Sequence, residues 1–117
     1  MSLTLYGIPN CDTVKKARTW LDDHQLAHTF HDFKKAGLTK DQIAQWLKAV
    51  PWEVLINKKG MTWRNLPDTK KAAVIDEASA IALMLESSSV IKRPVLCMDN
   101  AVLVGFTADL YQQQLKA

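Results

Sequence analysis

The amino-acid sequence predicts an α/β fold, and three observations support this prediction. A strand-helix-strand pattern fills residues 3–33, a mostly helical stretch follows, and two short apolar runs separated by a turn come near the end of the chain. The chain has 117 residues, which is the usual size of one domain. Since the helical stretch joins two β-rich ends without a Gly/Ser-rich linker, we interpret residues 1–117 as a single domain with a helical insert at about 34–89.

The opening pattern consists of a strand, an amphipathic helix and a second strand. Residues 3–8 are short and apolar, and the turn sequence Gly-Ile-Pro-Asn at 7–10 follows them. Within residues 12–23 the apolar side chains recur at spacings of three and four, which is typical of a helix with one buried face. Residues 28–33 place alternate side chains on two faces, as a half-buried strand does. Together these segments predict a β-α-β unit.

The remaining elements follow from the same periodicities and from turn residues. The apolar residues within 40–50 lie on one helical stripe, and Pro51 ends this helix. Asp68 and Asp76 are suitable N-caps for two further helices. The pair Asp99–Asn100 separates two apolar runs and predicts a hairpin. In chain order we expect helices at 40–50, from Asp68 and at 76–86, strands at 94–98 and 101–104, and a closing helix at 107–115.

The composition is that of a folded domain with a small excess of positive charge. Hydrophobic residues make up 48% and charged residues 23% of the chain, which excludes the disordered class, and the formal net charge is +3. Most lysines fall in pairs on separate segments, so we interpret them as solvated surface groups whose diffuse charge favours anionic small molecules. No apolar run approaches the ~20 residues that cross a bilayer, and we see no leader sequence. We therefore expect a cytoplasmic monomer without a membrane partner.

Neither the histidines nor the tryptophans indicate a bound metal or nucleic acid. On a strand, His28 and His31 are three residues apart and face opposite sides, and no second pair of ligands has suitable spacing. The four tryptophans fall mostly at helical positions compatible with a core, not in a stacking platform for bases. We expect no metal and no nucleic-acid partner.

Cys11 stands where the first strand gives way to the first helix. A cysteine at the amino end of a helix faces free backbone N–H groups and the positive end of the helix dipole, and both favour the thiolate. Lys15 and Arg18 follow at spacings of four and three and add positive potential, whereas Asp12 opposes it. This pattern predicts a nucleophile. The alternative is that Cys11 is a small buried apolar residue.

The chain has two cysteines, which is too few for a disulfide scaffold. Cys97 lies inside an apolar strand run with no nearby charge in sequence, so we expect it to be structurally buried. Val14 occupies the position where a Cys-x-x-Cys motif places its second thiol, and this excludes a local disulfide. A mixed disulfide with a small external thiol is the simplest alternative for Cys11.

Two arginines are candidates for anion binding. Arg93 precedes Pro94 at the start of a predicted strand, and a residue before proline adopts extended backbone, which leaves the Arg93 backbone open beside a ligand. Arg64 follows Trp63 among aromatic and apolar residues. Either arginine alone fits a surface salt bridge. Two of them converging on a thiolate form an anion site.

The segment Tyr6–Thr13, then Trp63–Arg64 and Arg93–Pro94, in this order, resembles the arsenate reductase (ArsC) and Spx family of thioredoxin-like proteins, and most closely its YffB branch. The resemblance runs from Leu3 to about Tyr111. It implies a thioredoxin-like fold with a four-stranded mixed sheet flanked by helices and a helical insert before the third strand.

The resemblance also implies roles for individual residues. Cys11 is then the nucleophile, Arg64 and Arg93 bind an oxyanion, and Pro94 is a cis-proline beside the thiol. Arsenate reductases carry a further arginine after the final hairpin, where this chain has residues 104–107 without one. One ligand for a tetrahedral oxyanion is therefore missing, which argues against arsenate as the natural substrate.

The Spx regulators, which bind RNA polymerase, usually carry a Cys-x-x-Cys switch at the same loop. This chain has Val14 in place of the second cysteine. That departure argues against a redox-switched regulator.

We therefore expect a glutathione-dependent thiol oxidoreductase with no tightly bound cofactor. The Cys11 thiolate attacks a disulfide or another oxidised group, and glutathione as co-substrate resolves the mixed disulfide. Lys15 and Arg64 favour the thiolate or bind glutathione carboxylates, and Arg93 holds the anionic part of the substrate. The residues expected to bind glutathione are Asn10, Thr13, Arg93 and Pro94. The alternatives are arsenate reduction with glutathione or a glutaredoxin, and a non-enzymatic, Spx-like binding or regulatory protein.

Overall fold

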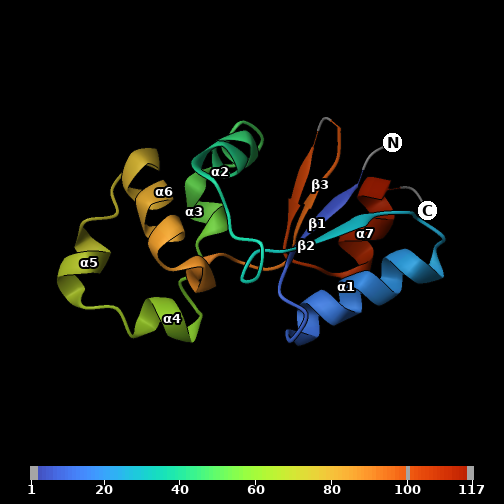
Figure 1. The fold of residues 1–117 in the computed structure, drawn as a ribbon, viewed down its shortest axis with the longest axis horizontal. Coiled ribbons are helices and arrows are strands. Elements are labelled where there is room, and N and C mark those ends of the chain that lie inside the picture. Colours follow the sequence, from blue (N-terminus) through green and yellow to red (C-terminus); the bar gives the residue numbers. More distant parts are fainter. Residues whose placement is uncertain (1–2, 100, 116–117) are drawn as a thin grey trace. The chain divides into compact units, whose positions relative to one another are not determined.

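The computed structural model describes residues 3–99 and 101–115, which divide into two compact units. The sheet unit joins residues 3–37 to 93–115, and the helical unit comprises residues 38–92 (Figure 1). The expected helical insert before the third strand is confirmed, with bounds a few residues further along the chain. That residues 1–117 act as a single domain stays a prediction.

The sheet is mixed and has four strands, as expected, and the strands lie in the order β2-β1-β3-β4. The central strand β1 pairs in parallel with β2 and antiparallel with β3, and β3 pairs antiparallel with β4. The register aligns Leu5 with Phe30 and Leu96, and Leu96 with Leu103, so these side chains share one face. The strand bounds are Thr4–Gly7 for β1, Thr29–Asp32 for β2, Val95–Cys97 for β3 and Val102–Val104 for β4.

Helices α1 (Asp12–Asp23) and α7 (Ala108–Leu115) supply the apolar residues that cover this face. Val14, Ala17 and Leu21 of α1 are spaced by three and four, and all three are fully buried. Among the described residues, no charged side chain belongs to the buried core, and its polar side-chain atoms belong to tryptophan and tyrosine. The buried cluster of the sheet unit consists of Leu3, Leu5, Ala17, Leu21, Leu96, Leu103 and Tyr111.

Gly7 at the end of β1 determines how closely α1 lies on the sheet. A Cβ atom on Gly7 would lie 2.8 Å from Cγ2 and 3.2 Å from Cγ1 of Val14. Val14 is fully buried, and its β-branched side chain has few rotamers into which it can retreat. The absence of a side chain at Gly7 therefore permits the first turn of α1 to pack against the strand.

Local sequence signals account for the longer helices of the helical unit. A capping box between Thr39 and Gln42 starts α2, and a second one between Asp76 and Ser79 starts α6. An isolated bridge pairs Ile56 with Ile91. The elements are α2 (Lys40–Leu47), α3 (Trp52–Leu55), α4 (Met61–Arg64), α5 (Asp68–Ala72), α6 (Glu77–Glu86) and the 3-10 turn η1 (Ser88–Val90). No helix in the described part of the chain is long and apolar enough to cross a membrane.

The observed elements follow the expected order, with three differences. Gly7, which we assigned to the turn, is the last residue of β1. Asp68 is the first residue of α5 after Pro67, and its side chain makes no cap hydrogen bond. Helices α3 and α4 were not expected, because helices of four residues are too short to show an apolar period. The second half of the expected turn at 99–100 lies outside the described residues.

We predict that Gly7→Ala destabilises the chain by about 1–3 kcal/mol, because the new methyl group overlaps the buried Val14 side chain. Urea unfolding measures the change in the free energy of unfolding. The double variant Gly7→Ala/Val14→Ala is the control, since removing the two Cγ atoms makes room for the methyl group. Its cost should be smaller than the sum of the single variants, and an additive result would contradict the proposed overlap.

The Tyr111 hydroxyl generates a second stability prediction. Tyr111 is fully buried, its oxygen has no hydrogen-bond partner, and burial raises the pKa of this phenol above its ordinary value of 10.0. Tyr111→Phe should therefore keep the free energy of unfolding at neutral pH or raise it by about 1 kcal/mol, since it removes an unsatisfied buried group.

The pH dependence of this effect has a defined sign. As pH rises above about 10, the Tyr111 phenol ionises in the unfolded chain but stays protonated in the folded chain. The free energy of unfolding therefore falls. Below about pH 10 this ionisation leaves the free energy of unfolding unchanged, and the loss grows as pH rises toward the raised pKa of the folded state. Urea unfolding at neutral and alkaline pH should show a weaker alkaline loss in Tyr111→Phe than in the parent chain. An equal alkaline loss of unfolding free energy in Tyr111→Phe and in the parent chain would show that the Tyr111 hydroxyl does not cause it.

Candidate functional site

The strand register brings three loops of the sheet unit to one end of the sheet. Tyr6 pairs with Val95, and Val95 pairs with Val104, so the end of β1, the start of β3 and the end of β4 are neighbours. The loop before α1, the Arg93–Pro94 pair and the segment after β4 continue from these three points. This end of the sheet is the candidate site, and it joins segments more than 80 residues apart in the sequence.

Cys11 is the N-cap residue of α1. Its backbone is extended, with φ −134° and ψ 123°, and its carbonyl oxygen accepts a hydrogen bond of 2.9 Å from the Lys15 N–H. No side chain accepts a capping hydrogen bond at the start of this helix of 12 residues. Its first backbone N–H groups therefore lie beside Cys11 without a capping partner. Cys11 is partly exposed, which does not fit the alternative of a small buried apolar residue.

The charged residues that follow Cys11 differ in their surroundings. Lys15 is exposed one turn after Cys11, and Asp12 is also exposed. The Arg18 guanidinium lies over the ring of Phe30 in β2, with 4.2 Å between its central carbon and the ring centroid. Lys15 is therefore the solvent-facing cation nearest in sequence to Cys11, whereas Arg18 packs on the sheet.

The Arg93–Pro94 peptide bond is cis, as expected. Pro94 is buried and Arg93 is partly exposed. The Gly105 N–H donates a 2.8 Å hydrogen bond to the Pro94 carbonyl oxygen, and Gly105 has φ 79°, a left-handed conformation that favours glycine. The start of β3 and the end of β4 are thus tied together where Arg93 enters the sheet.

The other expected site residues are distributed over both units. Asn10 is exposed and Thr13 is partly exposed in the sheet unit, and their contact with glutathione stays a prediction. Arg64 is the last residue of α4 in the helical unit, where it is exposed and its carbonyl oxygen accepts a 3.2 Å hydrogen bond from Lys71 Nζ. Convergence of Arg64 on the thiol also stays a prediction.

The two cysteines are too far apart to form a disulfide within the chain. Cys97 pairs with Thr4 at the start of β1, and the three residues from Thr4 to Gly7 span about 10 Å at the usual strand rise. Cys11 lies beyond Gly7, and α1 runs back from there along the strand, since Leu21 and Leu3 share one cluster. A disulfide requires Cα atoms within about 7 Å.

The burial expected for Cys97 is only partial. The neighbouring Leu96 belongs to the buried cluster on the α1 and α7 side, and Met98 packs against that cluster. Because side chains alternate along a strand, Cys97 lies on the opposite face, where it is half-buried. This face also carries Tyr6, whose pKa is raised by burial and, to a smaller extent, by the Cys97 thiol.

Sequence reasoning missed an aromatic cluster that joins α1, the segment after β4 and α7. The Tyr111 ring is nearly perpendicular to the rings of Trp20 and Phe106, with centroid distances of 5.5 and 4.7 Å and interplanar angles of 89° and 88°. Phe106 is the only aromatic residue among residues 104–107, and Trp20 lies far from it in the sequence. The pairing of Gly105 with Pro94 is what brings Phe106 to the site end of the sheet, and no local pattern signals that pairing.

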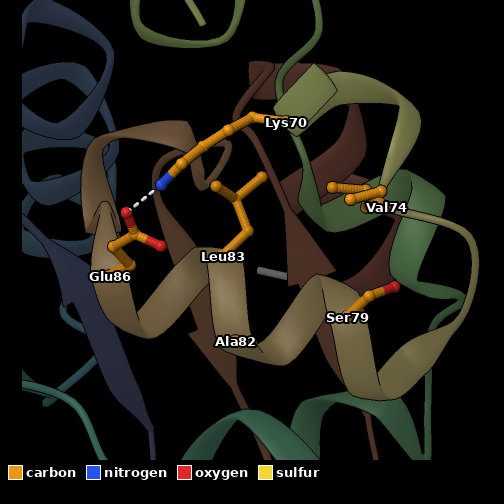
Figure 2. A pocket seen from close by; sticks show the side chains of 7 residues that line it. Lys70, Val74, Ser79, Ala82, Leu83 and Glu86 are labelled. Atoms are coloured by element: carbon orange, nitrogen blue, oxygen red, sulfur yellow. Dashed lines mark hydrogen bonds and ion pairs between the residues drawn. The ribbon is translucent and has the colours of Figure 1, made fainter. Parts of the chain in front are cut away.

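A separate pocket of about 230 Å³ lies between α5 and α6 in the helical unit. Figure 2 shows the ion pair of Lys70 and Glu86 on one side of it, with Leu83 and Val74 nearby and Ser79 at the other end. The Ser79 hydroxyl accepts a hydrogen bond from the Asp76 N–H and donates one to the Asp76 carboxylate in the cap of α6. This pocket contains no cysteine or histidine, and no group of three or more potential metal ligands occurs anywhere in the described chain.

Comparison with known proteins adds the family context. A model of the ArsC family matches residues 6–114. An uncharacterized protein of Haemophilus influenzae is 42% identical over 110 residues, which cover 94% of this chain and 96% of that protein. The global transcriptional regulator Spx of Streptococcus agalactiae is 29% identical over 112 residues, which cover 92% of this chain and 78% of Spx.

Two solved structures resemble the chain over nearly its whole length. A YffB protein has 46% sequence identity and a TM-score of 0.91, and the match covers 97% of this chain and 99% of that one. An arsenate reductase (ArsC) related protein from Brucella melitensis has 50% identity and a TM-score of 0.77, with coverage of 100% and 97%.

We predict that oxidation of the isolated chain with diamide produces no disulfide between Cys11 and Cys97, because the strand register separates them. Peptide mapping by mass spectrometry without a reducing agent is the measurement. Adding glutathione during oxidation should instead produce a glutathione adduct on Cys11, and Cys97→Ser should retain it. An abundant Cys11–Cys97 peptide would contradict the separation of the two thiols.

Proposed function

This chain belongs to the ArsC family of thioredoxin-like, arsenate reductase-related proteins, and we propose that it is a glutathione-dependent thiol oxidoreductase. The observation that carries the proposal is the position of Cys11, a partly exposed N-cap residue at the sheet end to which Arg93 and Pro94 belong. Because Cys97 lies near the other end of β1, the resolving thiol has to come from outside the chain.

The proposed reaction proceeds by two thiol-disulfide exchanges. The Cys11 thiolate attacks the glutathione sulfur of a substrate-glutathione disulfide, a bond forms between Cys11 and glutathione, and the substrate leaves as a thiolate that takes a proton from solvent. A second glutathione, as thiolate, attacks the glutathione sulfur of this adduct. Oxidised glutathione forms and the Cys11 thiolate is released, so that the substrate-glutathione disulfide and one glutathione give the substrate thiol and oxidised glutathione.

The residues around Cys11 have distinct roles in this proposal. The uncapped first turn of α1 presents N–H groups and the positive helix end to the thiolate, and Lys15 adds a positive charge one turn away. Pro94 has no N–H group and its oxygen already accepts a hydrogen bond from Gly105, so we assign backbone pairing with glutathione to Arg93. The Arg93 guanidinium then binds a carboxylate.

The remaining assignments extend the same proposal. Asn10 and Thr13 flank Cys11 in sequence and lie partly or fully exposed, which suits contact with a peptide ligand. Arg64 would bind the second carboxylate of glutathione. A glutathione co-substrate at millimolar level implies a reducing compartment, and we propose the cytoplasm and a monomeric chain.

Replacing the nucleophile tests the proposal. Cys11→Ser should lower turnover of hydroxyethyl disulfide in a glutathione-coupled assay by about a thousand-fold, because an alcohol at this position does not form the mixed disulfide. Cys97→Ser is the matched control and should keep the parent rate. Full turnover by Cys11→Ser would refute the proposed function.

Arsenate reduction is a second candidate, favoured by the relative that is described as related to arsenate reductase. Arg93 at the Cys11 end of the sheet is one ligand for an oxyanion, and residues 104–107 supply no further arginine. Arsenite release from millimolar arsenate that requires Cys11 and glutathione would favour this function. No release would remove it.

A non-enzymatic regulatory protein is the third candidate, favoured by the similarity to the regulator Spx. In that case the chain binds a protein partner regardless of the thiol. Equal recovery of one partner with the parent chain and with Cys11→Ser, together with no glutathione-coupled turnover, would favour this candidate.

A further inference from the structure

A groove on the sheet unit begins one helical turn from Cys11. It has a volume of about 320 Å³ and is lined by Lys15, Lys16, Thr19, Trp20 and Asp23 of α1 and by Phe106 after β4. We call it the Phe106 groove. Its volume lies in the range of sites for small organic ligands.

The apolar walls of this groove are held in place by a buried ring. Trp20 and Phe106 both meet Tyr111 edge-on, and Tyr111 is fully buried. Both wall residues are themselves only partly buried, so part of each ring is left to line the groove. A planar apolar group entering the groove therefore meets aromatic surface whose position is already determined.

The charges of the groove are distributed along α1. Lys15 and Lys16 lie at the end nearest Cys11, and Asp23 lies about 12 Å further along the helix axis from Lys15. The backbone N–H of Lys15 donates a hydrogen bond to the Cys11 carbonyl oxygen, so Lys15 lies one helical turn from the thiol. The positively charged end of the groove is therefore the end adjacent to Cys11. This polarity suits a ligand whose anionic group lies close to its reacting sulfur.

Phe106 belongs to the same end of the sheet as the thiol. It directly follows Gly105, whose N–H donates a hydrogen bond to the Pro94 carbonyl oxygen just before β3. The groove and Cys11 are thus parts of one unit and are connected through α1 on one side and through the β3–β4 pairing on the other.

From this arrangement we infer that the Phe106 groove binds the leaving half of the disulfide substrate, and that this half is an aromatic thiol with a carboxylate group. The inference rests on the proposed thiol-disulfide exchange at Cys11. When Cys11 attacks the glutathione sulfur, the bond to the aromatic sulfur breaks. The aromatic group then leaves the groove as a thiolate, which takes the electron pair of the broken S–S bond.

Direct exchange with three disulfides tests this inference without glutathione turnover. In the Cys97→Ser background, stopped-flow kinetics would follow the reaction of Cys11 with the disulfide of nitrobenzoate, with dithiodipyridine and with hydroxyethyl disulfide. The nitrobenzoate disulfide is aromatic and carries carboxylates, and dithiodipyridine is aromatic without a carboxylate. Hydroxyethyl disulfide has neither an aromatic ring nor a carboxylate. Each variant is compared with its parent for each disulfide, so intrinsic differences among the reagents cancel.

We expect Phe106→Ala to slow exchange with both aromatic disulfides about five-fold and to leave hydroxyethyl disulfide unchanged. Lys16→Gln should slow only the nitrobenzoate disulfide, by about three-fold. Lys40→Gln at the exposed start of α2 is the control for a lost surface charge and should change none of the three rates. Equal effects on all three disulfides, or no effect on any, would overturn the inference.

A second measurement excludes a general loss of structure and separates this inference from the proposed function. Naphthoate, which has no sulfur, should bind to Cys11→Ser as to the parent chain in NMR titrations and bind at least about five-fold more weakly to Phe106→Ala. Unchanged binding to Phe106→Ala would overturn the groove assignment. If the groove results hold while glutathione-coupled turnover is absent, the proposed function fails and the binding site stands.

Discussion

The close packing of Val14 on Gly7 is the constraint on which the site depends. With no side chain on Gly7, the first turn of α1 lies directly against the end of β1, and a methyl group there would come within 2.8 Å of a buried carbon. The helix then runs back over the strand and buries Ala17 and Leu21. Its amino end, with Cys11 as N-cap, is thereby held at one end of the sheet.

The antiparallel pairing of β1, β3 and β4 converts this local geometry into a site. The register places the start of β3 and the end of β4 beside the end of β1, so Arg93, Pro94 and Phe106 come to the end that holds Cys11. The same register places Cys97 beside Thr4, on the face opposite the buried cluster. A single set of backbone hydrogen bonds therefore both assembles the candidate site and excludes the second cysteine from it.

The separation of the cysteines and the surroundings of Cys11 favour a particular kind of chemistry. In the proposed reaction, Cys11 at the uncapped helix end needs an external thiol to complete the redox cycle. The aromatic walls and paired lysines of the Phe106 groove favour an organic anionic substituent over a small inorganic oxyanion. Selectivity would then arise on α1 and the segment after β4, next to Cys11.

The sequence by itself determined the order of the strands and of the longer helices, the N-cap position of Cys11, the absence of a Cys-x-x-Cys motif and, through the resemblance, the cis bond before Pro94. These features depend on neighbours within a few residues, on apolar periodicity or on a shared motif. Only the tertiary structure decided that Gly7 belongs to β1, that Cys97 is half-exposed and that Phe106 and Trp20 form a groove with two lysines. The physical reason is that strand register and helix-on-sheet packing join residues distant in sequence, and neither leaves a periodic signal along the chain.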